Sequence, residues 1–190
     1  MTRILIAGLP ALALAACSFG GKPPKQLLAL TPPVVQPNAG VPIDPARSIT
    51  VITPAAAAAI AGPRVPVYQG PNAFAYVKDA RWIEPPARQF QSLLTEALRA
   101  KGGRLVLDAR QTTVDPGQRL GGSLIAFGVD ATTSQAVVTF DAILTRGVEA
   151  SASRRFEARV PVGTIDALGS AAALDRAANQ VASEVAAWVN

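Results

Sequence analysis

The chain has 190 residues, no histidine, a single cysteine and a formal net charge of +5 at neutral pH. Without histidine a Ser-His-Asp triad is impossible and the commonest general base is missing, and zinc and haem sites are not expected. The basic residues form no large cluster, which argues against a nucleic-acid partner. We therefore expect a protein that is not an enzyme and needs no metal or cofactor. Catalysis by paired carboxylates is the open alternative, although Asp and Glu are few and scattered.

The N-terminus has the pattern of a secretion signal that ends in a lipid-attachment site. Arg3 precedes an apolar run over residues 4–13, which is too short to span a bilayer, since a span needs about 20 apolar residues. The sequence Leu-Ala-Ala-Cys at residues 14–17 resembles the bacterial lipobox, in which the cysteine is acylated and the peptide is cut before it. We expect removal of residues 1–16 and lipidation of Cys17; an ordinary signal peptide is the alternative.

The lipidated cysteine predicts where the protein is held. Residues 17–24 are rich in Gly and Pro and are expected to tether a single folded domain, residues 25–190. Several acyl chains make a durable membrane anchor, because each buried CH2 contributes roughly 0.8 kcal/mol. Aspartate after the cysteine would indicate inner-membrane retention, so Ser18 predicts an outer-membrane lipoprotein whose domain faces the periplasm.

The first half of the mature chain is rich in proline, which predicts short extended segments and no long helix. The β-branched and alternating patterns predict strands at residues 26–30, 48–53, 64–69 and 73–78. The turn signal Gly-Pro-Asn at residues 70–72 joins the last two. Alanines at residues 55–61 favour about two helical turns, which Gly62 ends.

The clearest helix is predicted at residues 86–101. Its apolar side chains recur at helical spacing and form one stripe, made of Phe90, Leu93, Leu94, Ala97 and Leu98. Pro86 suits the first turn and Gly102 suits the C-cap, so both ends carry the expected signals.

The second half of the chain predicts four strands and a final helix. The strands are expected at residues 104–109, 120–130, 136–146 and 154–162, the last three as an antiparallel meander with one buried face. The adjacent Gly121 and Gly122 indicate a bulge or a close packing contact rather than a phosphate-binding loop. Residues 170–189 form an amphipathic pattern and predict the closing helix.

Together these elements predict the α+β fold class. We expect a two-layer sandwich in which a mostly antiparallel sheet is covered on one face by two long amphipathic helices. No apolar stretch after Cys17 is long enough to cross a membrane as a helix.

The order of the segments resembles the ABC-type transport auxiliary lipoproteins, the family that contains PqiC. The resemblance rests on the segments at residues 28–30, 63–68, 81–86 and 118–130. The most diagnostic of them is the sequence Arg-Trp-Ile-Glu-Pro-Pro that precedes the long helix. One departure is Leu28, which stands where the family often has tyrosine.

The resemblance implies a non-enzymatic, lipid-anchored subunit of an ABC-type lipid transport system of the bacterial envelope. Such a subunit docks a periplasmic MCE-domain protein at the outer membrane, and a homo-oligomeric ring is one form the assembly could take. The alternatives are a stand-alone lipoprotein that binds lipid or another small molecule, and a structural envelope lipoprotein.

Besides Cys17, five residues are candidates for an interface or for a structural motif: Tyr68, Tyr76, Arg81, Trp82 and Glu84. Tryptophan is favoured at interfaces, but a core position between strand and helix is the simpler expectation for Trp82. Glu84 suits the N-terminus of a helix, and the tyrosines suit packing at the rim of a sheet.

Overall fold

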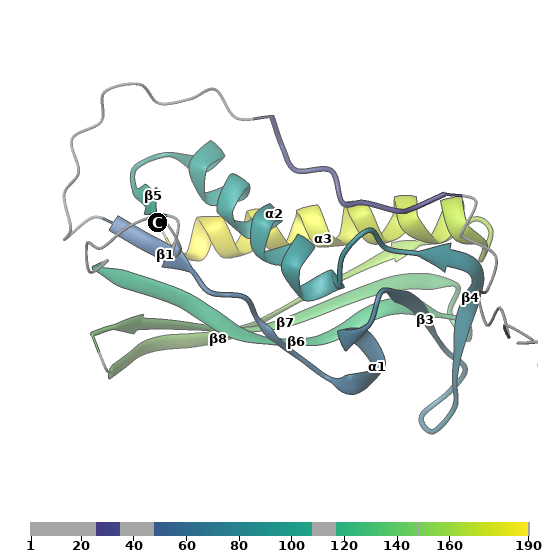
Figure 1. Cartoon of the computed structure of the whole chain (residues 1–190). Coiled ribbons are helices and arrows are strands. Elements are labelled where there is room, and N and C mark those ends of the chain that lie inside the picture. The colour runs from purple at the N-terminus through teal and green to yellow at the C-terminus, as the bar shows by residue number, and fades with distance from the viewer. Residues whose placement is uncertain (1–25, 35–47, 108–116, 148, 190) are drawn as a thin grey trace, which may run out of the picture.

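A computed structural model describes residues 26–34, 48–107, 117–147 and 149–189 of the chain. In this part of the chain one eight-stranded sheet carries two long helices on the same face (Figure 1). The strands are β1 (Ser48–Val51), β2 (Ala55–Ala56), β3 (Arg64–Tyr68), β4 (Phe74–Arg81), β5 (Leu105–Leu107), β6 (Gln118–Asp130), β7 (Gln135–Arg146) and β8 (Glu149–Pro161). The helices are α1 (Ala58–Ala61), α2 (Pro86–Lys101) and α3 (Ala167–Val189). The predicted α+β class is confirmed.

The sheet is mixed, so the prediction of a mostly antiparallel sheet is wrong. One edge of the long strand β6 pairs antiparallel with β7, which pairs antiparallel with β8, so the predicted meander is confirmed. Along its other edge, β6 pairs in parallel with β1, β2 and β3, and β1 also pairs in parallel with β5. Crossover connections, which the strand patterns do not encode, bring these segments alongside β6 in the same direction.

The helix layer packs on the alternate residues of the meander that point away from solvent. The Phe90 ring of α2 meets Phe140 of β7 edge to face, with ring centroids 5.2 Å apart. Near the other end of the layer, Trp188 of α3 meets Phe156 of β8 in the same way, at 5.6 Å. Both stripes of apolar side chains are therefore buried between helices and sheet, as predicted.

Helix α2 has the predicted bounds, while α3 starts three residues earlier than expected. Asp166 explains the early start, because its side-chain Oδ1 accepts a hydrogen bond from the Gly169 N–H over 2.7 Å and so caps the helix. The alanine run is only partly helical. Its first residues form β2 and pair with Ser123 and Leu124, because the edge of β6 offers main-chain hydrogen bonds there.

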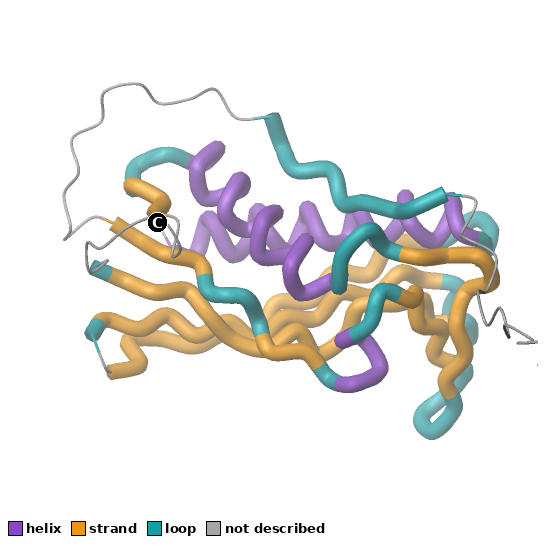
Figure 2. Tube along the Cα trace, in the orientation of Figure 1, coloured by secondary structure: helices purple, strands orange, loops and turns teal. Residues whose placement is uncertain are grey.

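The first predicted strand is reduced to a short bridge, in which Leu28 pairs with Trp82. The rest of residues 26–34 forms a loop that runs along the helix layer (Figure 2). We call residues 26–34 the N-terminal segment. Strand β5 ends at Leu107, and the last two residues predicted for it lie outside the described residues.

Candidate interaction surface

The N-terminal segment is fastened to both long helices. The Leu30 N–H donates to the Gln89 Oε1 of α2 over 2.8 Å, and this bond is buried. The Thr31 N–H donates to Asp175 Oδ1 of α3 over 2.7 Å, and Asn179 Nδ2 donates to the Thr31 carbonyl over 3.1 Å. Cys17, the predicted lipidation site, lies outside the described residues. The chain from that site therefore enters the fold through a segment with fixed contacts.

Trp82 lies in the core between strand and helix. Its side chain is 1% exposed and meets the Phe127 ring edge to face, with centroids 5.7 Å apart. Its main-chain N–H donates to the Pro63 carbonyl over 2.7 Å. The indole Nε1 has no hydrogen-bond partner among the described residues. Trp82 thus packs the junction where β4 ends and the chain turns toward α2.

The neighbours of Trp82 contribute through their main chains. The Arg81 carbonyl accepts a hydrogen bond from the Leu28 N–H over 2.8 Å, while the Arg81 side chain is exposed. The Glu84 carbonyl accepts a hydrogen bond from Gln89 Nε2 over 2.9 Å, and Glu84 itself precedes the first turn of α2. Both residues therefore help to hold the N-terminal segment against α2.

The two tyrosines lie on the β3–β4 hairpin. Tyr68 is partly buried, and its hydroxyl oxygen accepts a hydrogen bond from the Phe127 N–H over 3.2 Å. Burial raises the pKa of Tyr68, and that hydrogen bond opposes the rise. Tyr76 is exposed on β4, and the Arg64 guanidinium lies 3.8 Å from the centre of its ring. This stacking is a cation–π contact at the surface.

The face of the sheet opposite to α2 and α3, which we call the open face, carries exposed isoleucines. Ile143 follows a buried alanine on β7 and is exposed, because side chains alternate along the strand. Its partner on β6 is Gly121, which approaches the side chain of Ile52. Ile125 is also exposed, beside an irregularity of β6 between Leu124 and Ala126. We call Ile52 and Ile143, which meet across Gly121, the isoleucine patch.

Ion pairs border the isoleucine patch on β7 and β8. The Arg155 guanidinium donates to both carboxylate oxygens of Asp141, over 2.6 and 2.7 Å, and these bonds lower the pKa of Asp141 below its ordinary value. Arg159 Nε donates to Glu157 Oε1 over 2.7 Å and likewise lowers the pKa of Glu157. Because these groups are largely exposed to water, which screens their charges, the pairs add little to stability.

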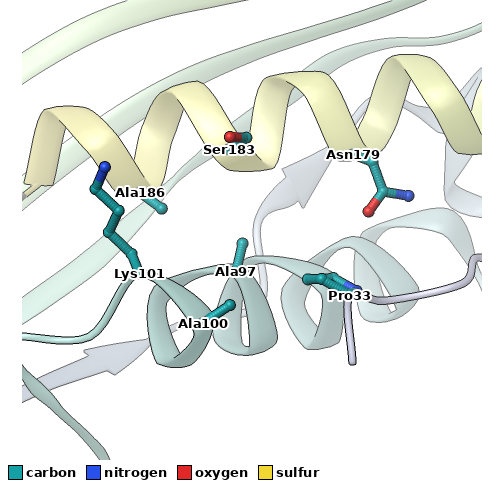
Figure 3. Close-up of a pocket in the computed structure, with 7 residues that line it drawn as sticks. All are labelled: Pro33, Ala97, Ala100, Lys101, Asn179, Ser183 and Ala186. Carbon is teal, nitrogen blue, oxygen red and sulfur yellow. The ribbon is translucent and has the colours of Figure 1, made fainter. Parts of the chain in front are cut away.

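A groove lies between the two long helices on the outer side of the helix layer (Figure 3). Its volume is about 290 Å³. Lys101 projects at one end of the groove. The residues that line the groove are mostly small: Pro33, Ala97, Ala100, Lys101, Asn179, Ser183 and Ala186. Pro33 places the N-terminal segment at the wall of this groove.

The predicted candidates do not converge on one site. Tyr68 and Tyr76 lie on the hairpin, Trp82 is in the core, and the isoleucine patch involves none of them. Alternation in the sequence predicts only which isoleucines point away from the core, so it does not indicate that Ile52 and Ile143 meet in a patch. Within the described residues, no group of His, Cys, Asp or Glu could hold a metal ion, and no helix could cross a membrane.

Solved structures share this fold. Protein XCC0632 from Xanthomonas campestris, of family DUF330, is 25% identical, with a TM-score of 0.70 over 86% of this chain and 94% of that one. An uncharacterized protein that is 14% identical superposes with a TM-score of 0.67 over 87% of this chain and all of the other. A PelC dodecamer from Paraburkholderia phytofirmans is 12% identical, over 77% and 91% of the chains, and its TM-score of 0.45 supports no argument about assembly. No curated protein matches the sequence.

The fold and its surface define an α+β domain in which helices cover one face of a mixed sheet and a fastened N-terminal segment crosses the helices. The model of the ABC-type transport auxiliary lipoprotein component family matches residues 28–186. The chain belongs to this family, as the sequence resemblance predicted. The matched residues begin in the N-terminal segment and end in α3, so they include every described strand and helix except the last three residues of α3.

Proposed function

We propose that this protein is a lipid-anchored, non-enzymatic subunit of an ABC-type lipid transport system in the bacterial envelope. Acylated Cys17 holds the domain at the periplasmic side of the outer membrane, and the domain docks the MCE-domain protein of the transporter. The observation that carries the proposal is the family match over residues 28–186, because it makes the whole domain an auxiliary transport component. The energy of ATP is used in another subunit.

We assign the isoleucine patch to the contact with the transporter partner. An exposed apolar centre with a rim of charged pairs has the composition of a protein–protein interface, in which the centre is dry and the rim stays hydrated. Arg155 and Arg159 supply the rim and are already oriented by their carboxylate partners. The partner surface that fits is apolar at its centre and polar around it.

The experiment is co-purification at native expression levels. The tagged lipoprotein, with its anchor intact, is extracted in detergent, and the captured MCE-domain protein is quantified. Ile143→Asp is expected to lower capture at least about tenfold, because burying an unpaired carboxylate in an apolar interface costs more than roughly 1.4 kcal/mol. Ile165→Asp is the matched control, since Ile165 is 38% exposed and Ile143 is 40% exposed.

If the wild-type lipoprotein captures no MCE-domain protein, the proposed transporter partner is contradicted. If the wild type and Ile143→Asp capture equal amounts, the isoleucine patch is not part of the interface, but the proposed partnership is unaffected.

The groove between α2 and α3 favours a second candidate function, a lipoprotein that itself binds a lipid or another small apolar molecule. Its volume of about 290 Å³ is at the lower limit for ligand pockets, which range from roughly 300 to 1,000 Å³. Mass spectrometry of the protein purified from membranes separates the two functions, because only the second predicts a co-purifying lipid in stoichiometric amount.

A further inference from the structure

Strand β8 forms a long edge of the sheet. It has 13 residues, and within the described part of the chain it pairs only with β7. Natural sheets seldom leave a long edge unpaired, because its free N–H and C=O groups are a template for another strand. The ladder to β7 is regular from Ala152 to Pro161, since its irregularity lies nearer the start of β8. The edge is therefore regular over most of its length.

The register of this ladder determines which main-chain groups of β8 face outward. The Val162 N–H donates to the Ser134 carbonyl over 2.9 Å, and these two residues continue the register in which Gln135 faces Pro161. Hydrogen-bonded pairs alternate with non-hydrogen-bonded pairs along an antiparallel ladder. The Pro161 carbonyl therefore points outward, and Arg176 Nη2 of α3 donates to it over 3.4 Å. The N–H and C=O groups of every second residue before it also point away from β7: Ser153, Arg155, Glu157 and Arg159.

The charged side chains of β8 leave this edge uncovered. Charges on an edge strand commonly prevent pairing, but those of β8 are held on the open face. Asp141 of β7 bonds the Arg155 guanidinium back over the sheet, and Arg159 is bonded to Glu157. Among the described residues, no main-chain hydrogen bond from another segment reaches the outward groups from Ser153 to Arg159. The free edge is therefore open to another strand.

We propose that β8 pairs antiparallel with β8 of a second copy of this chain, about a two-fold axis at Phe156. This axis lies at the middle of the regular part of β8. Arg155 of each copy then faces Glu157 of the other, and opposite charges that face each other across a strand pair are stabilising. Moving the axis by one residue, to Arg155 or to Glu157, would set like charges against each other. The edge is thus complementary to itself, as a two-fold interface requires.

Two-fold pairing of this kind keeps both helix layers on one side of the combined sheet. The N-terminal segment runs along the helices (Figure 2), so both copies start from the same side and one membrane can hold both proposed anchors. Trp188 of α3 meets the Phe156 ring at 5.6 Å and is only partly buried, so the axis places a tryptophan of each copy beside the seam. The pairing depends on the domain alone and not on the proposed transport role.

The first test measures the mass of the mature lipoprotein in detergent by light scattering over a range of concentrations. A dimer that dissociates on dilution is expected. Glu157→Pro should weaken it at least about tenfold, because proline removes an N–H that the second copy would bond. An edge strand tolerates proline where the lost N–H faced solvent. Glu157→Ala keeps the N–H and is the matched control, and circular dichroism checks that both variants fold.

Cysteine cross-linking tests the register and does not require the proline variant to fold. Acylation occupies the thiol of Cys17, as mass spectrometry of the sample checks, so Arg155→Cys and Glu157→Cys each have one free thiol. In an oxidised mixture these two variants should link to each other several-fold faster than either links to itself, because facing Cα atoms are about 5.5 Å apart. Ile143→Cys lies on the open face away from the edge and is the control.

Several results would overturn the pairing. A monomer at every concentration refutes it, and so does a complex larger than a dimer, because two-fold pairing of one edge closes after two copies. Cross-linking of Ile143→Cys with itself as fast as the mixed reaction would place the contact on the open face instead. Glu157→Cys that links to itself faster than to Arg155→Cys would move the axis to Glu157 and refute the register.

Discussion

At Gly122 the backbones of β6 and β7 lie too close together to leave room for a Cβ atom. Its φ of 135° lies in a region that L-residues rarely adopt, and a Cβ built on it would collide with the Asp141 carbonyl oxygen. Gly121 beside it has no such constraint, since its Cβ would make an ordinary 3.9 Å contact with Ile52. The predicted packing role of this glycine pair therefore belongs to Gly122 alone.

Gly122→Ala is expected to lower the free energy of unfolding by about 3 kcal/mol, because backbone strain adds to a steric collision. Gly121→Ala is the matched control and should change it by less than about 0.5 kcal/mol. Chemical denaturation followed by circular dichroism measures both. Equal effects of the two substitutions would contradict the argument.

At the scale of elements, the N-terminal segment and the two long helices act as one unit. Gln89 of α2 is 8% exposed and joins the segment to the start of that helix, since its Oε1 accepts a hydrogen bond from the Leu30 N–H and its Nε2 donates to the Glu84 carbonyl. The next residue of the segment, Thr31, donates its N–H to the carboxylate of Asp175 on α3. Hydrogen bonds thereby join the N-terminal segment to both helices.

Gln89→Ala is expected to lower the free energy of unfolding by about 2 kcal/mol, because it leaves the buried Leu30 N–H without a partner. Hydrogen exchange at the Leu30 amide should accelerate more than exchange in the core strands. Gln180→Ala serves as the control, since Gln180 is exposed and bonds to Glu184 within the same helix. Unchanged exchange at Leu30 would show that other contacts hold the segment.

At the scale of the whole molecule, we expect the proposed anchor and the domain to have separable roles. Cys17→Ser is expected to leave the thermal unfolding midpoint of the mature domain unchanged, because the described fold begins at residue 26. The variant should move from the membrane fraction to the soluble periplasmic fraction and fail to support transport. Full complementation of a deletion strain by this soluble form would show that the anchor is dispensable.

The sequence by itself determined the local elements and most of the core. The helical stripe from Phe90 to Leu98 predicted α2, and Pro86 and Gly102 marked its ends. The alternation of apolar residues indicated which face of the meander packs on the helices. The position of Trp82 before a helix also indicated its place in the core. Each of these depends on residues close in the chain, where periodicity of 3.6 or 2 specifies the buried side.

The tertiary structure alone decided which strands are neighbours and which surfaces form. Alternation shows which face of a strand is buried but not which strand lies beside it, so the parallel pairing of β1, β2 and β3 on β6 was not predictable. The bond from Thr31 to Asp175 joins residues 144 positions apart. Likewise, Ile52 and Ile143 become one patch only because Gly121 lies between them on β6. Such long-range contacts arise from the packing of the whole chain, which local periodicity does not record.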